Sequence, residues 1–303
     1  MLLDAASLYY RAYFGVPENV TAPDGTPVNA VRGFLDMTAH LITTRRPTGV
    51  VACLDEDWRP AFRVAAIPSY KAHRLAPDST EAEATPDTLA PQVPILMAVL
   101  DAAGIVRVGA AGYEADDIIG TLATRADGPV DIVTGDRDLL QLIRDAGPVR
   151  VCYTGRGVTN LELFDEAAVA AKYAIPGRAY ADYAVLRGDP SDGLPGVPGV
   201  GDKTAATLIT AYGSLDALLA DLDGTPPTTA LRAVTPAVRK KLHGARDYLA
   251  AAPAVVRVCT DIPLPVLTAA VPTQPADPEV LLELADRWGL GGSVERLLRA
   301  CAG

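Results

Sequence analysis

The sequence predicts an α/β fold with a mainly parallel sheet flanked by helices. Three observations indicate this fold: short apolar runs rich in β-branched residues, helical patterns between them, and acidic residues soon after several of the runs. Such apolar runs are typical of strands buried on both faces. The strands are expected at Met1–Leu3, Gly49–Leu54, Ile105–Val108, Val130–Val133 and Val149–Tyr153. The helices are expected near Val28–Thr43, Thr88–Ala102 and Asp116–Ala126.

Residues 59–86 have a different character from the segments on either side. They combine prolines and scattered basic residues with the acidic, polar stretch DSTEAEATPD. Neither helical nor strand periodicity runs through them, and proline interrupts both kinds of element. We therefore expect a mobile loop or arch, which would lie over the functional site at the edge of the sheet.

From about Ala181 the pattern becomes helical, with frequent glycine and proline. We therefore predict a sheet-containing core over residues 1–180 and a second, helical part over residues 181–303. Proline-rich joints at Thr225–Thr228 and Pro263–Pro275 separate the later helices. The last predicted helix, Pro278–Cys301, is expected to pack back on the sheet.

Nine carboxylates arrive in short, separated groups, several of them soon after a predicted strand. Parallel strands bring such residues to one edge of a sheet, where open α/β folds build their sites. Any one of these acids alone is better explained as a helix cap or turn residue. Together they would repel one another unless divalent cations neutralised them, which favours a metal site. The nine are Asp4, Asp55, Glu114, Asp116, Asp117, Asp136, Asp138, Asp189 and Asp192.

The formal net charge of −10 does not exclude a nucleic acid as the substrate. Without the nine clustered acids the chain would carry −1, because −10 + 9 = −1. Metal ions would offset the charge of the acids that bind them, so these acids would not repel a phosphate ligand. The acidic net charge does predict that non-specific binding to DNA is weak. Four scattered cysteines without C-x-x-C spacing argue against a disulfide framework or a zinc site. No signal peptide or membrane-spanning apolar run is evident, so a soluble, cytoplasmic protein is expected.

The carboxylate pattern predicts hydrolysis of a phosphate ester assisted by two divalent metal ions. No Ser/His/Asp or Cys/His set competes for the role, since the three histidines are scattered. A glycine-rich segment, Leu194–Ala206, follows the last two acids. Gly199 and Gly201 permit a tight turn between helices, and backbone N–H groups at the next helix start can hold a phosphate. Lys203 adds positive charge there, although the turn alone could be a plain helix connection.

Four motifs resemble those of the 5′ nuclease domain of bacterial DNA polymerase I and of stand-alone flap endonucleases. They are F-R-x-x-x-x-P-x-Y-K-A-x-R (Phe62 to Arg74), GYEADD (Gly112 to Asp117), TGDRDLLQL (Thr134 to Leu142) and GDPSDGLPGVPGVGDKTA (Gly188 to Ala205). The resemblance runs from Asp4 to about Asp261. It implies a PIN-like nuclease core that carries a helix–three-turn–helix module for binding duplex DNA.

The resemblance also assigns roles to residues. It implies that Asp4, Asp55, Glu114, Asp116, Asp136 and Asp138 lie nearest a first Mg²⁺ or Mn²⁺. Asp117, Asp189 and Asp192 complete the set, the last two near a second ion. Tyr70 would stack on the terminal base, and Lys71 and Arg74 would stabilise charge on the phosphate. Gly199, Val200, Gly201, Lys203 and Thr204 would grip the duplex, with K⁺ held by carbonyls of residues 194–201.

The implied activity is a structure-specific 5′ flap endonuclease and 5′→3′ exonuclease that uses a two-metal mechanism. It would leave 5′-phosphate and 3′-hydroxyl ends on branched DNA or RNA-primed hybrids during replication and repair. A monomer is expected, with no polymerising domain after Gly303. Two alternatives are a DNA-binding scaffold that has lost catalysis and a ribonuclease acting on structured RNA. The balance of the two activities, the preferred metal, 3′-flap recognition, protein partners and a start upstream of Met1 stay open.

Overall fold

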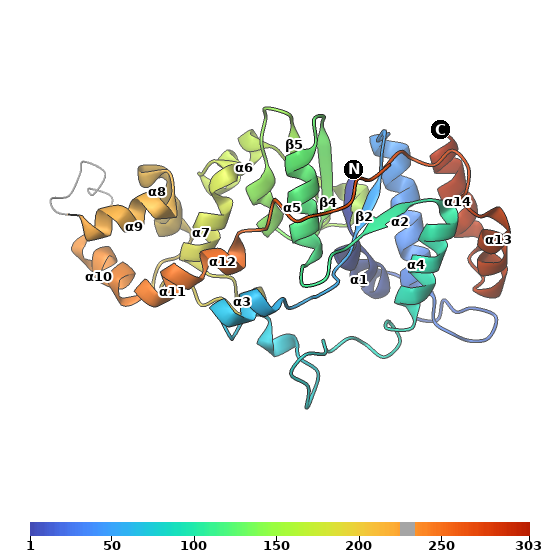
Figure 1. Ribbon diagram of the computed structural model, residues 1–303, viewed down its shortest axis with the longest axis horizontal. Helices are drawn as coiled ribbons and strands as arrows, with labels where there is room; N and C mark the ends of the chain where they lie inside the picture. Colours follow the sequence, from blue (N-terminus) through green and yellow to red (C-terminus); the bar gives the residue numbers. More distant parts are fainter. Residues whose placement is uncertain (225–233) are drawn as a thin grey trace.

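A computed structural model describes residues 1–224 and 234–303, so the proline-rich joint predicted at residues 225–228 lies outside the described residues. The centre is a six-stranded sheet in the order β3-β2-β1-β4-β5-β6 (Figure 1). The first five strands are parallel to their neighbours and β6 is antiparallel to β5, which confirms the predicted fold class. The strands are β1 (Leu2–Asp4), β2 (Val51–Cys53), β3 (Val106–Val108), β4 (Val130–Thr134), β5 (Val149–Tyr153) and β6 (Glu162–Phe164).

Each face of the sheet is covered by helices. Neighbouring residues of a strand point to opposite faces, so Leu2 and Leu3 of β1 belong to two different hydrophobic clusters. On one face lies α5 (Ala115–Arg125). On the other lie α1 (Ala5–Gly15), α2 (Asn29–Arg45) and α4 (Gln92–Ala103). β1 and β2 are buried along their whole length, which explains their apolar sequences, whereas β3 and β6 at the two edges of the sheet carry exposed residues.

The helical part extends from one end of the sheet (Figure 1). Its buried residues, such as Leu208 and Leu249, continue the same hydrophobic cluster as the α5 face of the sheet. No single described helix is long and apolar enough to span a membrane, although α8 and α9 together meet that test as a pair bent by 79°. The helices are α6 (Glu166–Tyr173), α7 (Tyr180–Arg187), α8 (Asp202–Tyr212), α9 (Leu215–Asp223), α10 (Pro236–Gly244), α11 (Arg246–Ala251) and α12 (Pro253–Val256).

The C-terminal segment returns to the sheet-containing core. The Val50 N–H donates to the carbonyl of Ala269 (2.8 Å), which ties the extended chain beside β2. The single helix predicted at Pro278–Cys301 is wrong: α13 (Pro278–Arg287) and α14 (Gly291–Ala302) are separated by a turn in which Gly289 has φ +62°. These helices pack on α4 and α2, respectively, rather than directly on the sheet.

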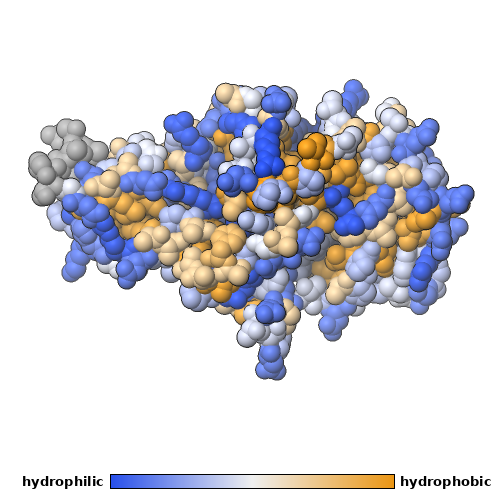
Figure 2. Space-filling view, viewed as in Figure 1, coloured by the Kyte–Doolittle hydropathy of each residue, from blue (hydrophilic) through white to orange (hydrophobic). Residues whose placement is uncertain are grey.

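Residues 59–86 are more ordered than the predicted loop. They contain α3 (Ala61–Ala66) and a 3₁₀ turn (Ala72–Arg74), and the rest is held by hydrogen bonds. The indole N–H of Trp58 donates to the carbonyl of Glu81 (2.9 Å), and the Tyr10 hydroxyl donates to Glu83 (3.3 Å). The segment projects from the body of the protein (Figure 1), and its tip is hydrophilic (Figure 2).

Candidate active site

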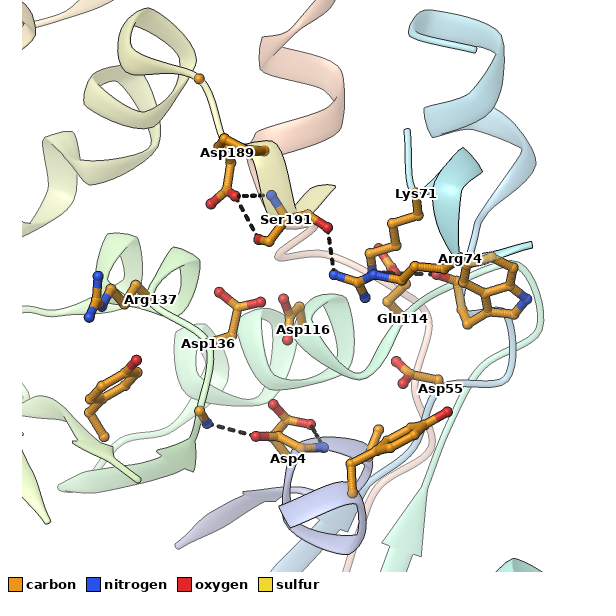
Figure 3. A pocket seen from close by; sticks show the side chains of 18 of the residues that line it. Asp4, Asp55, Lys71, Arg74, Glu114, Asp116, Asp136, Arg137, Asp189 and Ser191 are labelled. Carbon is orange, nitrogen blue, oxygen red and sulfur yellow. Dashed lines mark hydrogen bonds and ion pairs between the residues drawn. The ribbon is translucent and has the colours of Figure 1, made fainter. Parts of the chain in front are cut away.

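The strand order brings three acids to one edge of the sheet. Asp4 ends β1, Asp55 follows β2, and Asp136 follows β4. Because β1 lies between β2 and β4, these three carboxylates meet at the carboxyl edge of the sheet (Figure 3). Glu114 and Asp116, at the start of α5, and Asp189, after α7, line the same pocket of about 850 Å³. The predicted convergence of acids is therefore present for these six residues.

Asp4 lies at the bottom of this pocket. One of its oxygens accepts a hydrogen bond from the Ser7 N–H (3.1 Å) and the other from the Thr134 hydroxyl (2.6 Å). Burial, together with the negative charge of Asp55, raises the pKa of Asp4 to about 7. No cationic side chain of the described residues pairs with Asp4.

Asp116, Asp136 and Asp138 also have no salt-bridge partner in the described part of the chain. Burial and the charges of Asp136 and Asp4 raise the pKa of Asp116 well above its ordinary value. Burial and the charge of Asp136 do the same to the pKa of Asp138. Oδ1 of Asp138 is buried without any hydrogen-bond partner among the described residues. Buried polar atoms are seldom left this way, which indicates a ligand-binding role.

The other side of the pocket carries cations. Lys71 Nζ donates to Glu114 Oε1, and Arg74 donates to Asp192 Oδ1 (3.0 Å) and to the carbonyl of Ser191 (2.8 Å). Burial opposes the charge of Lys71, but the carboxylates of Glu114 and Asp192 outweigh it and raise the pKa of the ammonium. Both cations line the pocket, as the sequence predicts, and face the unpaired acids across it.

Asp117 points away from the pocket, unlike its neighbour Asp116. Its two oxygens accept hydrogen bonds from both terminal nitrogens of Arg63 (2.7 Å each), and one oxygen also accepts from the Cys259 N–H (2.8 Å). Its side chain is fully buried, and Arg63 is only 2% exposed. The metal-binding role predicted for Asp117 stays a prediction, but in this structure a buried bidentate ion pair already occupies both oxygens of the carboxylate.

Arg63 was not predicted as a site residue, although it belongs to the F-R motif. Its Nη1 also donates to Glu114 Oε2 (2.7 Å), and its Nε donates to the carbonyl of Val255 (2.9 Å). One side chain from α3 thus joins the start of α5 to α12. The residue holds Glu114 in place from behind the pocket.

Tyr70 is likewise placed differently from the prediction. The residue is 3% exposed and its hydroxyl donates to Glu114 Oε2 (2.7 Å). A ring buried in this way has no free face for a nucleobase, so the predicted stacking does not fit this conformation. Tyr70 instead orients Glu114, together with Arg63 and Lys71.

The glycine-rich turn leads into α8 beside the pocket. Gly199 adopts φ +73°, and a Cβ added there would lie 2.7 Å from Lys241 Nζ. That ammonium donates to the Gly199 carbonyl (2.8 Å). The Val200 side chain is buried and its N–H donates to the Val197 carbonyl (2.9 Å), so both are used within the protein, and the predicted contact of Val200 with the duplex stays a prediction. Gly201 and Lys203 are exposed, and Thr204 is half-buried.

The pocket suits a hard divalent cation by its chemistry. Its acidic lining residues present carboxylate oxygens, the donors that Mg²⁺ and Mn²⁺ prefer. Among the described residues, no three acidic, histidine or cysteine side chains are yet gathered as the ligands of one ion. Burial, and after it the charges of neighbouring carboxylates, raises the pKa values of Asp4 and Asp116, and a bound cation would offset both effects.

Two family models match consecutive parts of the chain. Residues 1–174 match the model described as "5′-3′ exonuclease, N-terminal resolvase-like domain", and residues 175–279 match "5′-3′ exonuclease, C-terminal SAM fold". A 5′-3′ exonuclease of Streptomyces coelicolor is 60% identical over 301 residues, covering 98% of both chains. A 5′-3′ exonuclease of Mycobacterium tuberculosis is 53% identical over 312 residues, covering 99% of this chain and 96% of its own length.

The fold is also that of a solved nuclease. The bacteriophage T5 flap endonuclease, in a pseudo-enzyme–product complex with DNA and metal ions, superimposes with a TM-score of 0.64. The match covers 100% of this chain and 99% of the other, at 15% sequence identity. Similarity at this level concerns the fold.

Proposed function

The chain belongs to the 5′-3′ exonuclease family, and on that premise we propose that it is a structure-specific 5′ flap endonuclease and 5′→3′ exonuclease. Its reaction is the hydrolysis of DNA phosphodiesters to 5′-phosphate and 3′-hydroxyl ends, in primer and flap removal during replication and repair. The observation that carries the proposal is the pocket itself. Unpaired carboxylates occupy one side, and Lys71 and Arg74 occupy the other.

We assign the metal-holding role to the acids of this pocket, with Mg²⁺ or Mn²⁺ as the ions. Asp4, Asp55, Asp116 and Asp136 provide oxygens at the sheet edge, and Asp138 adds its unpartnered Oδ1 from the adjoining turn. Glu114, Asp189 and Asp192 provide the opposite side, the last two for a second ion. When bound, such ions supply an activated water and charge to stabilise the departing oxygen.

The chain's own residues position the phosphate. Lys71 and Arg74 exchange carboxylate or carbonyl partners for the non-bridging oxygens of the scissile phosphate as the substrate enters. Both side chains are pre-oriented by their present contacts, so little conformational entropy is lost on binding. Arg63 and Tyr70 do not touch the substrate; they fix Glu114, which in turn orients Lys71.

The duplex beside the junction binds the turn before α8. Exposed Gly201 and Lys203, with half-buried Thr204, offer a helix start and a positive charge to a phosphate. K⁺ held by carbonyls of residues 194–201 is a further part of the proposal. The Gly199 carbonyl is already occupied by Lys241, so the ion would use the remaining carbonyls. RNA-primed hybrids are proposed as additional substrates, and the protein is proposed to act in the cytoplasm as a monomer.

The test is cleavage of flapped duplexes labelled at the 5′ end or internally, with Mg²⁺, Mn²⁺ or EDTA. Metal-dependent incision at the flap base, absent in EDTA, is the expected result. Binding to the junction without incision in either metal would overturn the proposal in favour of a DNA-binding scaffold. Faster cutting of all-RNA flaps than of DNA flaps would overturn it in favour of a ribonuclease.

A further inference from the structure

The side chain of Gln141 joins two segments that lie far apart in the sequence. Its Nε2 donates to the carbonyls of Asp138 (2.8 Å) and Val256 (3.0 Å), and its Oε1 accepts from the Val258 N–H (3.1 Å). Both donors of the amide are therefore used within the protein. Gln141 belongs to the TGDRDLLQL motif but does not line the carboxylate pocket. A side chain bound in this way to two stretches of backbone is suited to hold them together.

The first segment is the 3₁₀ turn Asp138–Leu142, which begins with an acid to which we assign a metal-holding role. The Asp138 N–H donates to Asp136 Oδ1 (2.8 Å), and the Asp138 carbonyl accepts from Gln141. Oδ1 of Asp138 is buried and has no hydrogen-bond partner among the described residues. The position of this oxygen therefore depends on the backbone of the turn, which Gln141 holds at its first residue.

The second segment consists of residues 255–262, which we call the strap. It begins in α12 and runs across α5 toward the C-terminal helices (Figure 1). A Cβ added at Gly120 of α5 would lie 2.6 Å from the carbonyl oxygen of Cys259, so the helix admits the strap there only because this residue is glycine. The hydroxyl of Thr121 accepts from the Ile262 N–H (3.3 Å). The strap is therefore packed directly on α5.

The strap is also bound beside the start of α5. The Cys259 N–H donates to Asp117 Oδ1 (2.8 Å), and the carbonyl of Val255 accepts from Arg63 Nε (2.9 Å). Asp116, the residue before Asp117, lines the pocket, whereas none of residues 255–262 does. The strap is therefore fixed from behind to the helix that carries Asp116.

The strap thus connects two elements that carry separate acids. Asp116 lies on α5, and Asp138 lies on the 3₁₀ turn that Gln141 ties to the strap. Carboxylates from different elements bind a divalent ion well only when their oxygens are held at the right spacing, because Mg²⁺ demands nearly ideal octahedral geometry. Loss of the Gln141 amide would remove the hydrogen bonds that tie the turn to the strap.

We propose that Gln141 is a positioning residue for the metal-holding acids. By binding the strap it fixes Asp138 relative to Asp116 from behind the pocket, without touching the ions or the DNA. This inference rests on the proposed function and adds a residue through which the fold sets the spacing of the acids. Groups that orient metal ligands in this indirect way typically change metal affinity by about 10- to 100-fold when they are lost.

The test replaces Gln141 with methionine, which has a similar length and volume but forms none of the three hydrogen bonds. Mn²⁺ dissociation constants are measured by calorimetry without DNA, at a temperature where thermal unfolding shows the variant to be folded. Gln141→Met is expected to bind Mn²⁺ about 10- to 100-fold more weakly than wild type. The Mn²⁺ concentration for half-maximal flap cleavage should rise by a similar factor, with KM for the flapped duplex unchanged, because Gln141 does not touch the DNA.

Thr121→Val is the matched control, because it removes a hydrogen bond at the other end of the same strap. Valine keeps the shape of threonine but cannot accept from the Ile262 N–H. The contacts of Gln141 and Asp117 with the strap remain. The melting temperature should fall by a few degrees, as for Gln141→Met, while Mn²⁺ affinity should stay as in wild type. Equal losses of Mn²⁺ affinity in the two variants would show that any loosening of the strap weakens binding, and would overturn the role of Gln141.

Gln141→Asn is a second test in case Gln141→Met does not fold. It keeps the amide on a shorter side chain that cannot reach both segments, so the same loss of Mn²⁺ affinity is expected. If wild-type protein binds Mn²⁺ and cleaves flaps while a folded Gln141 variant keeps the wild-type Mn²⁺ affinity, the positioning role is wrong and the flap nuclease stands. If wild-type protein neither binds Mn²⁺ nor cleaves flaps, the proposed function fails, and the role of Gln141 fails with it.

Discussion

The two sides of the carboxylate pocket differ in how their charge is balanced. On one side Glu114 and Asp192 face Lys71 and Arg74, and Asp117 behind them is clamped by Arg63. On the other side Asp4, Asp116, Asp136 and Asp138 have no cationic partner among the described residues. Burial raises the pKa values of acids on both sides, to about 7 for Asp4 and for Glu114, so the two sides differ in their ion pairs. On the first side, cations of the chain itself balance the charge of the acids. On the second side, the carboxylates repel one another and no cation of the described residues offsets that repulsion.

This difference distinguishes acids whose ion pairs stabilise the fold from acids that remain free to bind an ion. A buried carboxylate such as Asp117, whose two oxygens both accept from one arginine, stabilises the fold and is left without free lone pairs for an ion. A group of unsatisfied carboxylates destabilises the fold until an external cation arrives. The stability and the activity of the protein should therefore respond in opposite ways to substitutions on the two sides.

The largest expected effect comes from Asp136→Asn on the unpaired side. Cleavage should fall on the order of 1,000-fold, equivalent to about 4 kcal/mol of transition-state stabilisation. The melting temperature in EDTA should stay the same or rise, because one of several repelling charges is gone. In the wild-type protein the Asp138 N–H donates a hydrogen bond to Asp136 Oδ1 (2.8 Å), and the side-chain oxygen of asparagine can accept the same hydrogen bond. Single-turnover cleavage and thermal unfolding measure the two effects.

A control for this variant is Asp101→Asn, which removes an exposed acid that pairs with Arg107. It should leave both quantities nearly unchanged, since exposed pairs are worth about 0–1 kcal/mol. A clear fall in the metal-free melting temperature of Asp136→Asn would contradict the view that this side is electrostatically strained.

The next effect is expected on the clamped side. Arg63→Gln leaves Asp117 buried without its partner, which should lower the free energy of unfolding by about 3–5 kcal/mol. Denaturant unfolding in EDTA measures the loss. Arg107→Gln is the matched control at an exposed pair and should cost less than about 1 kcal/mol. If Arg63→Gln were as stable as wild type, the ion pair between Arg63 and Asp117 would contribute nothing to the free energy of unfolding.

The pH dependence of metal-free stability is expected to be smaller. The folded pKa of Asp4 is about 7, above the value of about 3.9 in an unfolded chain. Between these values the folded state binds more protons than the unfolded state, so stability falls as pH rises through this window. Melting temperatures in EDTA should therefore decrease by a few degrees between about pH 5 and pH 7.5.

Metal should reverse this trend. Ligating carboxylates must be deprotonated, so saturating Mg²⁺ should stabilise the protein more at pH 7.5 than at pH 5. Equal stabilisation at the two pH values would contradict the assignment of raised pKa values to the metal-holding acids.

The smallest effect is expected for Tyr70→Phe. The variant loses one hydrogen bond to Glu114, and kcat should fall about tenfold with KM unchanged, since a hydrogen bond to a charged group is worth about 1.5–3 kcal/mol. Steady-state kinetics on a flapped duplex measure both constants. A rise in KM with kcat preserved would instead favour base stacking by Tyr70.

Local features of the sequence predict much of this site. Five of the six strands are short apolar runs, and acids that follow β1, β2 and β4 necessarily meet at the sheet edge. β6 was missed because two of its three residues, Glu162 and Leu163, are exposed and give no buried-strand pattern. Helix α1 was also missed; it begins at Ala5, directly after the last residue of β1, with no loop to mark its start.

The roles of individual acids depend on distant parts of the chain. Asp116 and Asp117 are adjacent, but the helix turns about 100° per residue, so one faces the pocket and the other the core. What saturates Asp117 is Arg63, which is 54 residues away in sequence and lies on another helix. No local pattern shows that contact, and the same holds for the burial of Tyr70.

The most direct measurement is a Mn²⁺ titration, by calorimetry, of wild-type protein, Asp136→Asn and Asp117→Asn at neutral pH. Each variant is first shown to be folded at the temperature used. Asp136→Asn should lose most of its Mn²⁺ affinity, and folded Asp117→Asn should bind Mn²⁺ nearly as tightly as wild type. If both folded variants lost Mn²⁺ affinity equally, Asp117 would be a metal ligand as well. That result would contradict the division of the acids into a side with ion pairs and a side without them.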